Sequence, residues 1–311
     1  MEQSSALCLP RHLRMSNIYL VTGPPGTSKT GWLKEQIARQ AAELGPTEIV
    51  VTSFTRAAAI EISSRGLPLP DSHVGTLHKL CFHAAGMPKL ADTDAGLKAW
   101  NETAPVYWQL GGGADIDNPL DIGGSTEADK IFADYMKYRN MLTPRDYWRL
   151  EVQDFAQAWE DWKDQMGFMD FTDLLEWGVT DLPVCPTVPQ IIYVDEAQDL
   201  TPLQYKLLTG WAQHARAVVM AGDPDQCIYQ FIGASHRLFM DESVPAENRR
   251  LLRQSYTMPQ AAHAWSQEWI SQVEDRDEAP YKPTDVIGKV TASGAKYTWP
   301  DPLLYDIEEL P

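Results

Sequence analysis

The sequence predicts an α/β fold in which a parallel sheet is flanked by helices and interrupted by a mostly helical insertion. An apolar run at 18–22 is followed by a glycine-rich loop, a helical stretch at about 32–44 and a β-branched run at 48–53. Strand, loop, helix and strand in this order are typical of parallel strands joined by crossover helices. Apolar runs of the same kind return only at 190–195 and 217–222, after a long segment without them. That gap predicts the insertion.

The changes of pattern divide the chain into five parts. We expect an N-terminal tail at 1–17, the first part of the sheet domain at 18–88, a helical insertion at 89–168, the second part of the sheet domain at 169–249, and the incomplete start of a second domain at 250–311. Further helices are expected at about 56–65, 127–140, 154–165 and up to about 272. Trp159 and Trp162 lie three residues apart on one helical face, which favours core packing over a ligand site.

Composition limits the class of protein. The 311 residues carry a formal net charge of −17, with 44% hydrophobic and 22% charged residues, as in a globular protein of roughly two domains. The negative charge argues against a protein that coats polyanions in general. It does not exclude a local groove that binds nucleic acid. No apolar run approaches the ~18–20 residues that span a bilayer, and we see no secretory signal. Because the four cysteines lie far apart, we expect reduced thiols in a cytoplasmic protein, or in the host cytoplasm for a phage gene.

The loop after the first strand has the composition of a phosphate-binding loop. It reads Gly23-Pro24-Pro25-Gly26-Thr27-Ser28-Lys29-Thr30 and opens a helix, so backbone N–H groups and the helix N-terminus can face phosphates. Lys29 is predicted to reach the β- and γ-phosphates, and the Thr30 hydroxyl to bind Mg²⁺. Ser28 replaces the usual second glycine, and a positive φ there would cost about 1 kcal/mol. The alternative is a surface turn without a ligand.

A nucleotide site of this kind needs a carboxylate on a neighbouring strand. The strand at 190–195 ends in Asp195 and Glu196, at the edge where open α/β sheets bind ligands. Asp195 suits an outer contact to Mg²⁺, and Glu196 can polarise an attacking water. Alone, such a pair is more typical of a helix cap or a solvated turn. The loop at 23–30 favours the nucleotide site.

Further motifs follow in order along the chain. Residues 52–58 read TSFTRAA, 75–78 read GTLH, 169–175 read MDFTDLL, 195–199 read DEAQD, 222–234 read GDPDQCIYQFIGA and 253–259 read RQSYTMP. With the phosphate loop, this series resembles the motifs of the UvrD/Rep-like superfamily 1 DNA helicases. The resemblance implies a RecA-like P-loop NTPase sheet, and an ATP-dependent helicase or translocase that uses Mg²⁺ and single-stranded DNA.

The resemblance also implies roles for individual residues. Lys29, Glu196 and Gln226 become the expected catalytic residues, with Gln226 sensing the γ-phosphate and Tyr256 stacking on adenine. The expected DNA track consists of Phe54, Thr55, Thr76, His78 and Phe231, since aromatic faces stack on bases and hydroxyls contact phosphates.

Several of these residues also have structural interpretations. Phe54 and Phe231 can be core residues, and His78 can be a capping or core histidine. Asp170 and Asp173 we interpret as capping or linking residues and not as metal ligands.

The chain departs from the family at the end of the motif series. Thr257 stands where an arginine is expected to meet the γ-phosphate, and Arg249, Arg250 or Arg253 are candidates to replace it. No clear adenine-reading glutamine precedes the first strand; Gln3 is a weak candidate. Only about fifty residues follow Pro259. We therefore expect an incomplete second motor domain, which a separate chain would complete, while 279–311 can equally be a partner-bound extension.

Two other function classes stay open. One is a helicase-derived adaptor that binds DNA or a partner without efficient catalysis. The other is a P-loop enzyme acting on a small molecule, such as a kinase, against which the motifs around Phe54, Thr76 and Phe231 count.

Overall fold

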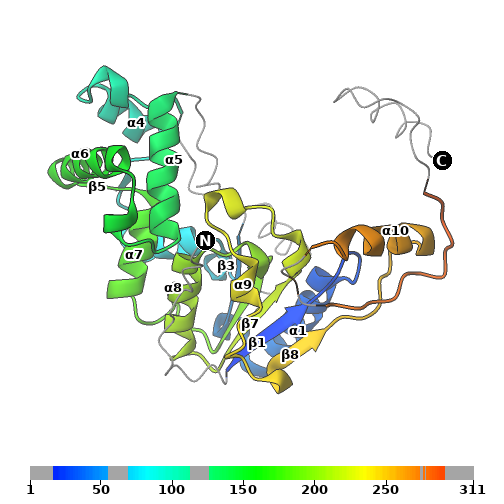
Figure 1. The fold of residues 1–311 in the computed structure, drawn as a ribbon. Helices are drawn as coiled ribbons and strands as arrows, with labels where there is room; N and C mark the ends of the chain where they lie inside the picture. The colour runs from blue at the N-terminus through cyan, green and yellow to red at the C-terminus, as the bar shows by residue number, and fades with distance from the viewer. Residues whose placement is uncertain (1–16, 55–68, 113–125, 274–275, 277, 291–311) are drawn as a thin grey trace.

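A computed structural model of the chain describes residues 17–54, 69–112, 126–273, 276 and 278–290 (Figure 1). Six strands form a sheet in the order β3-β2-β6-β7-β1-β8, and all of its pairings are parallel. These strands are β1 Ile18–Thr22, β2 Ile49–Ser53, β3 Val74–Gly75, β6 Ile191–Asp195, β7 Ala217–Gly222 and β8 Arg249–Leu251. The predicted RecA-like α/β fold is thereby confirmed.

Helices connect the strands and build the insertion. They are α1 Lys29–Leu44, α3 Leu77–Ala84, α4 Asp94–Asn101, α5 Glu127–Asn140, α6 Leu150–Met166, α7 Phe171–Asp181, α8 Pro202–Ala212, α9 His236–Phe239 and α10 Gln260–Ile270. The helix expected at 56–65 lies outside the described residues. None of the helices in the described ranges is both long and apolar enough to cross a membrane.

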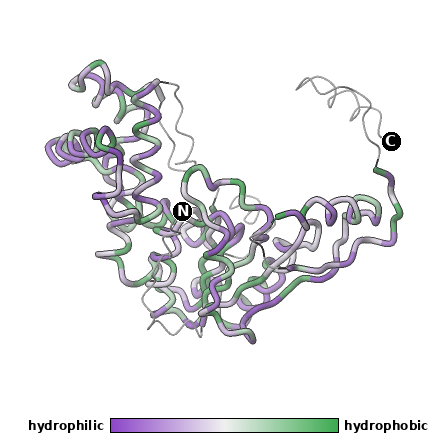
Figure 2. Tube along the Cα trace, in the orientation of Figure 1, coloured by the Kyte–Doolittle hydropathy of each residue, from purple (hydrophilic) through white to green (hydrophobic). Residues whose placement is uncertain are grey.

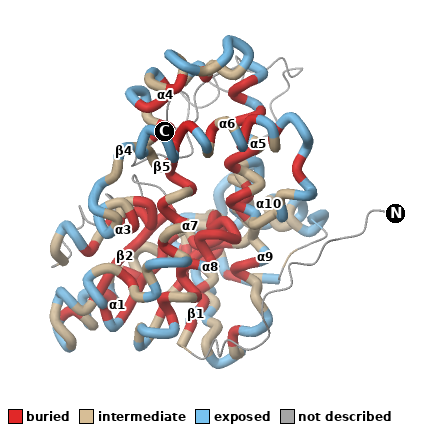
Figure 3. Tube along the Cα trace, turned by 90° about the vertical axis from the view of Figure 1, so that its left-hand side faces the viewer, coloured by how far each residue is buried: buried red, intermediate tan, exposed pale blue. Residues whose placement is uncertain are grey.

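The sheet lies between two helical layers. Helix α1 places Leu33 and Ile37 in one core with Val21 and Val51, while α7 and α8 contribute to a larger core with β6 and β7. Strands β2 and β6 are buried along their whole length, as expected for strands covered on both faces. Figure 3 shows this burial around α7 and α8. The layers hold the carboxyl ends of β1, β2, β6 and β7 along one edge, where the predicted site residues follow.

The insertion has its own aromatic core. Trp100, Phe132, Phe155 and Trp159 pack with rings 5.1–6.0 Å apart, and Trp162 joins them. The tryptophans at 159 and 162 are therefore core residues, as predicted. Polar and apolar residues alternate along the insertion helices (Figure 2). A short parallel pair, β4 Lys89–Leu90 with β5 Phe168–Met169, joins the two ends of the insertion.

A buried ion network ties the insertion to the sheet domain. Asp170 and Asp173 form a capping box at the start of α7, which confirms their capping role. Arg139 of α5 donates two hydrogen bonds to Asp170, at 2.8 and 3.0 Å, and also binds Asp173 and Glu176. Lys163 of α6 donates to Asp170 at 2.6 Å. The network thus links three helices through one carboxylate that is fully buried.

The last strand extends the first sheet. Leu251 of β8 pairs with Thr22 of β1, so the sheet continues two residues beyond the boundary expected at 249. The next helix, α10, has no buried residue, and its Trp265 and Trp269 are exposed. Figure 1 shows α10 on the side of the sheet opposite to the insertion. The division of the chain into domains stays a prediction.

Candidate functional site

The phosphate loop leaves β1 and enters α1 through two left-handed residues. Gly26 has φ 72°, and Ser28, the residue before α1, has φ 60° and ψ 46°. Thr27 stabilises the turn, since its hydroxyl and its backbone N–H both donate to Pro24 O, at 2.7 and 3.2 Å. The position that carries serine in place of glycine therefore has the positive φ that makes glycine favourable.

Lys29 and Thr30 lie at the N-terminus of α1, as predicted. Lys29 Nζ donates to Gly23 O at 2.8 Å, so the lysine side chain folds back over the phosphate loop. Thr30 Oγ1 donates to Asp195 Oδ2 at 3.3 Å, across 165 residues of sequence. This contact joins the loop after β1 to the acidic end of β6. The positive end of the α1 dipole faces the same place.

Asp195 and Glu196 occupy the carboxyl end of β6. Burial, together with the charge of Glu196, raises the pKa of Asp195 to about 6, while hydrogen bonds from Glu196 N and Thr30 oppose this rise. Glu196 has a left-handed backbone, φ 52°, and accepts a hydrogen bond from Gln198 Nε2 at 2.9 Å. A hydroxyl beside a buried carboxylate is a hard oxygen donor set that suits Mg²⁺. Thr30 and Asp195 therefore fit this ion.

The loop after β7 carries Gln226. Its amide Nε2 donates to Asp223 Oδ2, and Asp223 N donates to Gln198 Oε1 at 3.0 Å. Burial raises the pKa of Asp223, and the charge of nearby Lys29 lowers it. Gln198 and Asp223 thus connect Glu196, Lys29 and Gln226. Both residues stand in the motifs 195–199 and 222–234, but the sequence pattern alone indicates no role for them.

Residues 255–257 lie directly on the phosphate loop. Ser255 Oγ donates to Pro25 O at 3.0 Å, and Tyr256 N donates to Gly26 O at 2.8 Å. A Cβ on Gly26 would collide with Thr257 Oγ1 and Ser255 Oγ, so the glycine allows this close approach. The Tyr256 side chain beside the loop is 68% exposed. Ser255 is a contact that the sequence analysis missed.

Within the part of the chain that the structure describes, the three candidate arginines make their contacts away from the phosphate loop. Arg249 donates to Val244 O and Asp241 O, and the guanidinium of Arg250 lies 5.3 Å from the centre of the Trp32 ring. Arg253 is exposed, and its backbone oxygen accepts from Lys282 N. Thr257, in contrast, occupies the position beside Gly26.

The candidate DNA residues separate into exposed and buried ones. Phe231 is 66% exposed, whereas Phe54 at the end of β2 is only 4% exposed. The Tyr229 ring lies between them, 5.0 Å from Phe54 and 6.1 Å from Phe231. Phe54 therefore supports an aromatic row of which Phe231 is the accessible end. Tyr229 was quoted in its motif without a role.

Thr76 and His78 have structural contacts. Thr76 is buried and caps α3, because its Oγ1 accepts from Lys79 N at 3.2 Å. His78 is buried with its ring edge against Phe171, and burial lowers its pKa to about 4. Among the described residues, none forms a hydrogen bond with its Nδ1. These placements match the core interpretation of His78. Thr55 lies outside the described residues.

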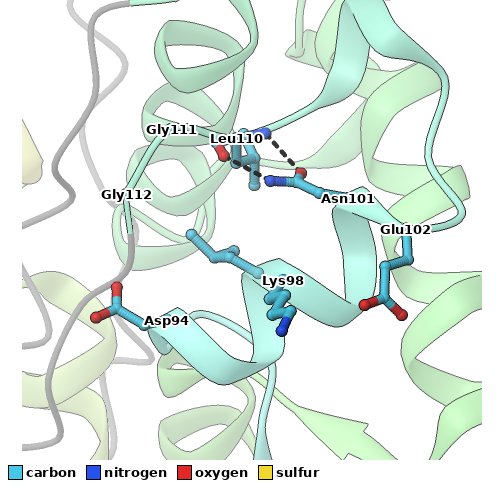
Figure 4. A pocket seen from close by; sticks show the side chains of 8 residues that line it. Asp94, Lys98, Asn101, Glu102, Leu110, Gly111 and Gly112 are labelled. Carbon is cyan, nitrogen blue, oxygen red and sulfur yellow. Dashed lines mark hydrogen bonds between the residues drawn. The ribbon is translucent and has the colours of Figure 1, made fainter.

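A separate cavity of about 350 Å³ lies in the insertion, between α4 and residues 110–112 (Figure 4). Its wall is fixed by Asn101, which exchanges hydrogen bonds of 2.8 and 2.9 Å with Leu110 O and N. None of the predicted site residues lines it.

Comparison with known proteins agrees with this geometry. The model of an AAA domain family matches residues 8–232. The chain is 26% identical to the ATP-dependent DNA helicase UvrD2 of Mycobacterium tuberculosis (strain H37Rv), over 70% of this chain and 36% of that protein. It is also 26% identical to the ATP-dependent DNA helicase PcrA of Leuconostoc citreum, over 78% of this chain and 35% of that protein. The ATP-dependent DNA helicase SRS2 of Saccharomyces cerevisiae is 25% identical over 71% of this chain.

A phosphate loop joined to a strand-end acid across a parallel sheet defines a P-loop NTPase. The chain belongs to the AAA domain family and is a member of the UvrD/Rep-like superfamily 1 helicases. It contains an ATP-dependent DNA helicase-like region, and it spans about a third of the length of the bacterial relatives named above.

Proposed function

We propose that this chain binds Mg–ATP at the phosphate loop and single-stranded DNA beside Phe231, and that it hydrolyses ATP. The contact between Thr30 and Asp195 carries the proposal, because it sets a phosphate loop against a buried acid beside Glu196 and the loop of Gln226. When bound, Mg²⁺ supplies positive charge that offsets the negative charge of the phosphates. Thr30 and Asp195 are the residues that would hold it.

The chain's own residues then have distinct tasks. Lys29 exchanges Gly23 O for phosphate oxygens, so a hydrogen bond from the charged ammonium to a neutral oxygen becomes one between opposite charges. Glu196 accepts a proton from the water that attacks the γ-phosphate, and Gln198 holds the Glu196 carboxylate. Gln226 leaves Asp223 to contact the γ-phosphate. Tyr256 lies beside the loop and offers an exposed ring to adenine.

The same proposal includes the domain division. Residues 18–88 and 169–249 form one motor domain with the insertion 89–168, and 250–311 begin a second motor domain. The exposed Trp265 and Trp269 of α10 support this, since such side chains are usually covered by a partner surface. We propose a separate chain as the partner that covers these two tryptophans.

The test is ATP turnover by the purified chain with and without oligo-dT, beside Lys29→Ala and the matched control Lys34→Ala, which lies about one and a half turns further along α1. We expect turnover that DNA stimulates, loss of at least about 100-fold in Lys29→Ala, and little change in Lys34→Ala. Equal turnover in the wild type and Lys29→Ala would refute the assignment of the loop.

A helicase-derived adaptor is the second candidate. The strained Ser28 and the threonine at 257 favour it, because both depart from a complete catalytic site. This alternative predicts that Lys29→Ala leaves DNA binding intact while the wild type shows no turnover.

A further inference from the structure

A segment near the end of the described chain runs along the residues that cover the phosphate loop. We call residues 276 and 278–288 the strap. Lys282 O accepts from Ser255 N at 2.8 Å, Thr284 N donates to Met258 O at 2.8 Å, and Val286 O accepts from Gln260 N at 2.9 Å. Because Ser255 Oγ in turn donates to Pro25 O, Ser255 connects the strap to the phosphate loop.

The strap is also tied to the loop of Gln226. Arg276 Nε and Nη2 donate to the two carboxylate oxygens of Asp225, at 3.1 and 2.7 Å. The two side chains are 16% and 19% exposed, so this is a partly desolvated, two-pronged ion pair. Elsewhere in the strap, Tyr281 packs against His263 of α10, with ring centres 4.6 Å apart. Asp225 therefore holds the Arg276 guanidinium through two hydrogen bonds, while Tyr281 anchors the strap to α10.

The position of this pair relates it to the γ-phosphate. Asp225 lies directly between Asp223, which experiences the charge of Lys29, and Gln226, the expected γ-phosphate sensor. The loop 223–226 thus experiences the charge of Lys29 at Asp223 and binds Arg276 at Asp225. Thr257, next to Gly26, cannot supply a charge there.

We propose that Arg276 is a catalytic arginine that leaves Asp225 and binds the γ-phosphate of ATP. This inference rests on the proposed function. The exchange replaces one two-pronged carboxylate contact with a two-pronged phosphate contact, so little net interaction energy is lost. The movement of Arg276 to the γ-phosphate brings the strap, and with it residues 253–261, onto the nucleotide.

The chemical step is hydrolysis. The water oxygen forms a bond to the γ-phosphorus, the bond to the β,γ-bridging oxygen breaks, and its electron pair stays on ADP. The water proton goes to Glu196. Arg276 keeps all its protons and compensates the charge that develops on the phosphoryl oxygens, a role worth ~10³–10⁵ in rate when an arginine fills it.

The first measurement compares affinities, independently of turnover. Fluorescent ADP and a non-hydrolysable fluorescent ATP analogue are titrated, with Mg²⁺, into the full chain and its variants. We expect Arg276→Ala to weaken the ATP analogue by about 10-fold and to leave ADP unchanged, because only the γ-phosphate is contacted. Unchanged ADP affinity also shows that the variant is folded. Arg216→Ala, an exposed arginine beside the first residue of β7, is the matched control.

Substitution of the partner residue Asp225 distinguishes a catalytic role of Arg276 from a purely structural role in holding the strap. Asp225→Asn removes the competing carboxylate, so we expect the ATP analogue to bind about 2- to 5-fold more tightly. If Arg276 only braced the strap, Asp225→Asn would weaken binding as Arg276→Ala does, and that result would overturn the inference. Equal weakening of ADP and ATP analogue by Arg276→Ala would overturn it too.

Turnover provides the second readout. In the presence of oligo-dT, kcat of Arg276→Ala is expected to fall by at least about 10³-fold. A wild-type turnover that depends on Lys29 but not on Arg276 would reject this inference and leave the proposed function standing. A wild type that binds neither nucleotide would reject both.

Discussion

Ser28 combines a left-handed backbone with a side chain that makes no capping hydrogen bond to α1. We therefore expect Ser28→Gly to stabilise the protein. The left-handed conformation costs an L-residue roughly 1–2 kcal/mol, which glycine avoids. The greater conformational freedom of glycine in the unfolded chain offsets about 0.4–1 kcal/mol of this gain. The net increase in the free energy of unfolding is about 0.5–1 kcal/mol.

Urea denaturation followed by tryptophan fluorescence measures this change as a higher midpoint at unchanged slope. Ser28→Ala is the matched control, since it removes the hydroxyl but keeps the Cβ, and it should stay within about 0.5 kcal/mol of the wild type. Gly26→Ala should change stability in the opposite direction, because at φ 72° its Cβ would collide with Thr257 and Ser255. A lower midpoint in Ser28→Gly, or equal gains in Ser28→Gly and Ser28→Ala, would refute the backbone argument.

Three further predictions concern other parts of the chain. Arg139→Leu should lower the free energy of unfolding by about 3 kcal/mol, because Asp170 stays buried with its charge only partly compensated; a loss below about 1 kcal/mol would contradict this. His78 has a pKa of about 4 when folded and about 6.5 when unfolded, so the unfolded state binds its proton first as the pH falls. Between about pH 7.5 and pH 5 the wild type should therefore lose about 2 kcal/mol more stability than His78→Gln, and parallel pH profiles would rule this out. Phe231→Ala should weaken oligo-dT binding by about 5- to 100-fold at unchanged thermal stability, whereas Phe54→Ala should lower stability by about 3 kcal/mol; the reverse pattern would remove Phe231 from the DNA surface.

Much of the candidate nucleotide site could be predicted because its parts are contiguous. The order of strand, loop and helix at 18–44 specifies where backbone N–H groups gather, and the apolar run before Asp195 specifies the neighbouring strand. For residue 28 the sequence indicated only a condition, a cost if its φ is positive, and the structure shows that φ is 60°. The order of motifs was also enough to identify the family before any contact was known.

The candidate DNA residues show what a sequence pattern does not determine. Phe54 and Phe231 both stand in helicase-like motifs, yet one is buried and the other exposed, and Tyr229 completes the aromatic row between them. Burial depends on which residues from elsewhere in the chain pack against a side chain, so the identity of a residue within a motif does not determine its burial. His78 and Thr76 illustrate the same point through their contacts in α3.

Local features of this protein follow from the sequence alone: strand and helix positions, the phosphate loop, the acids at strand ends and the family. Only the tertiary structure brings Thr30 to Asp195 over 165 residues, and Arg276 to Asp225 over 51. The physical reason is that hydrogen bonds and ion pairs act over a few ångströms, while the distance between residues far apart in sequence is decided by how the sheet and its helices pack.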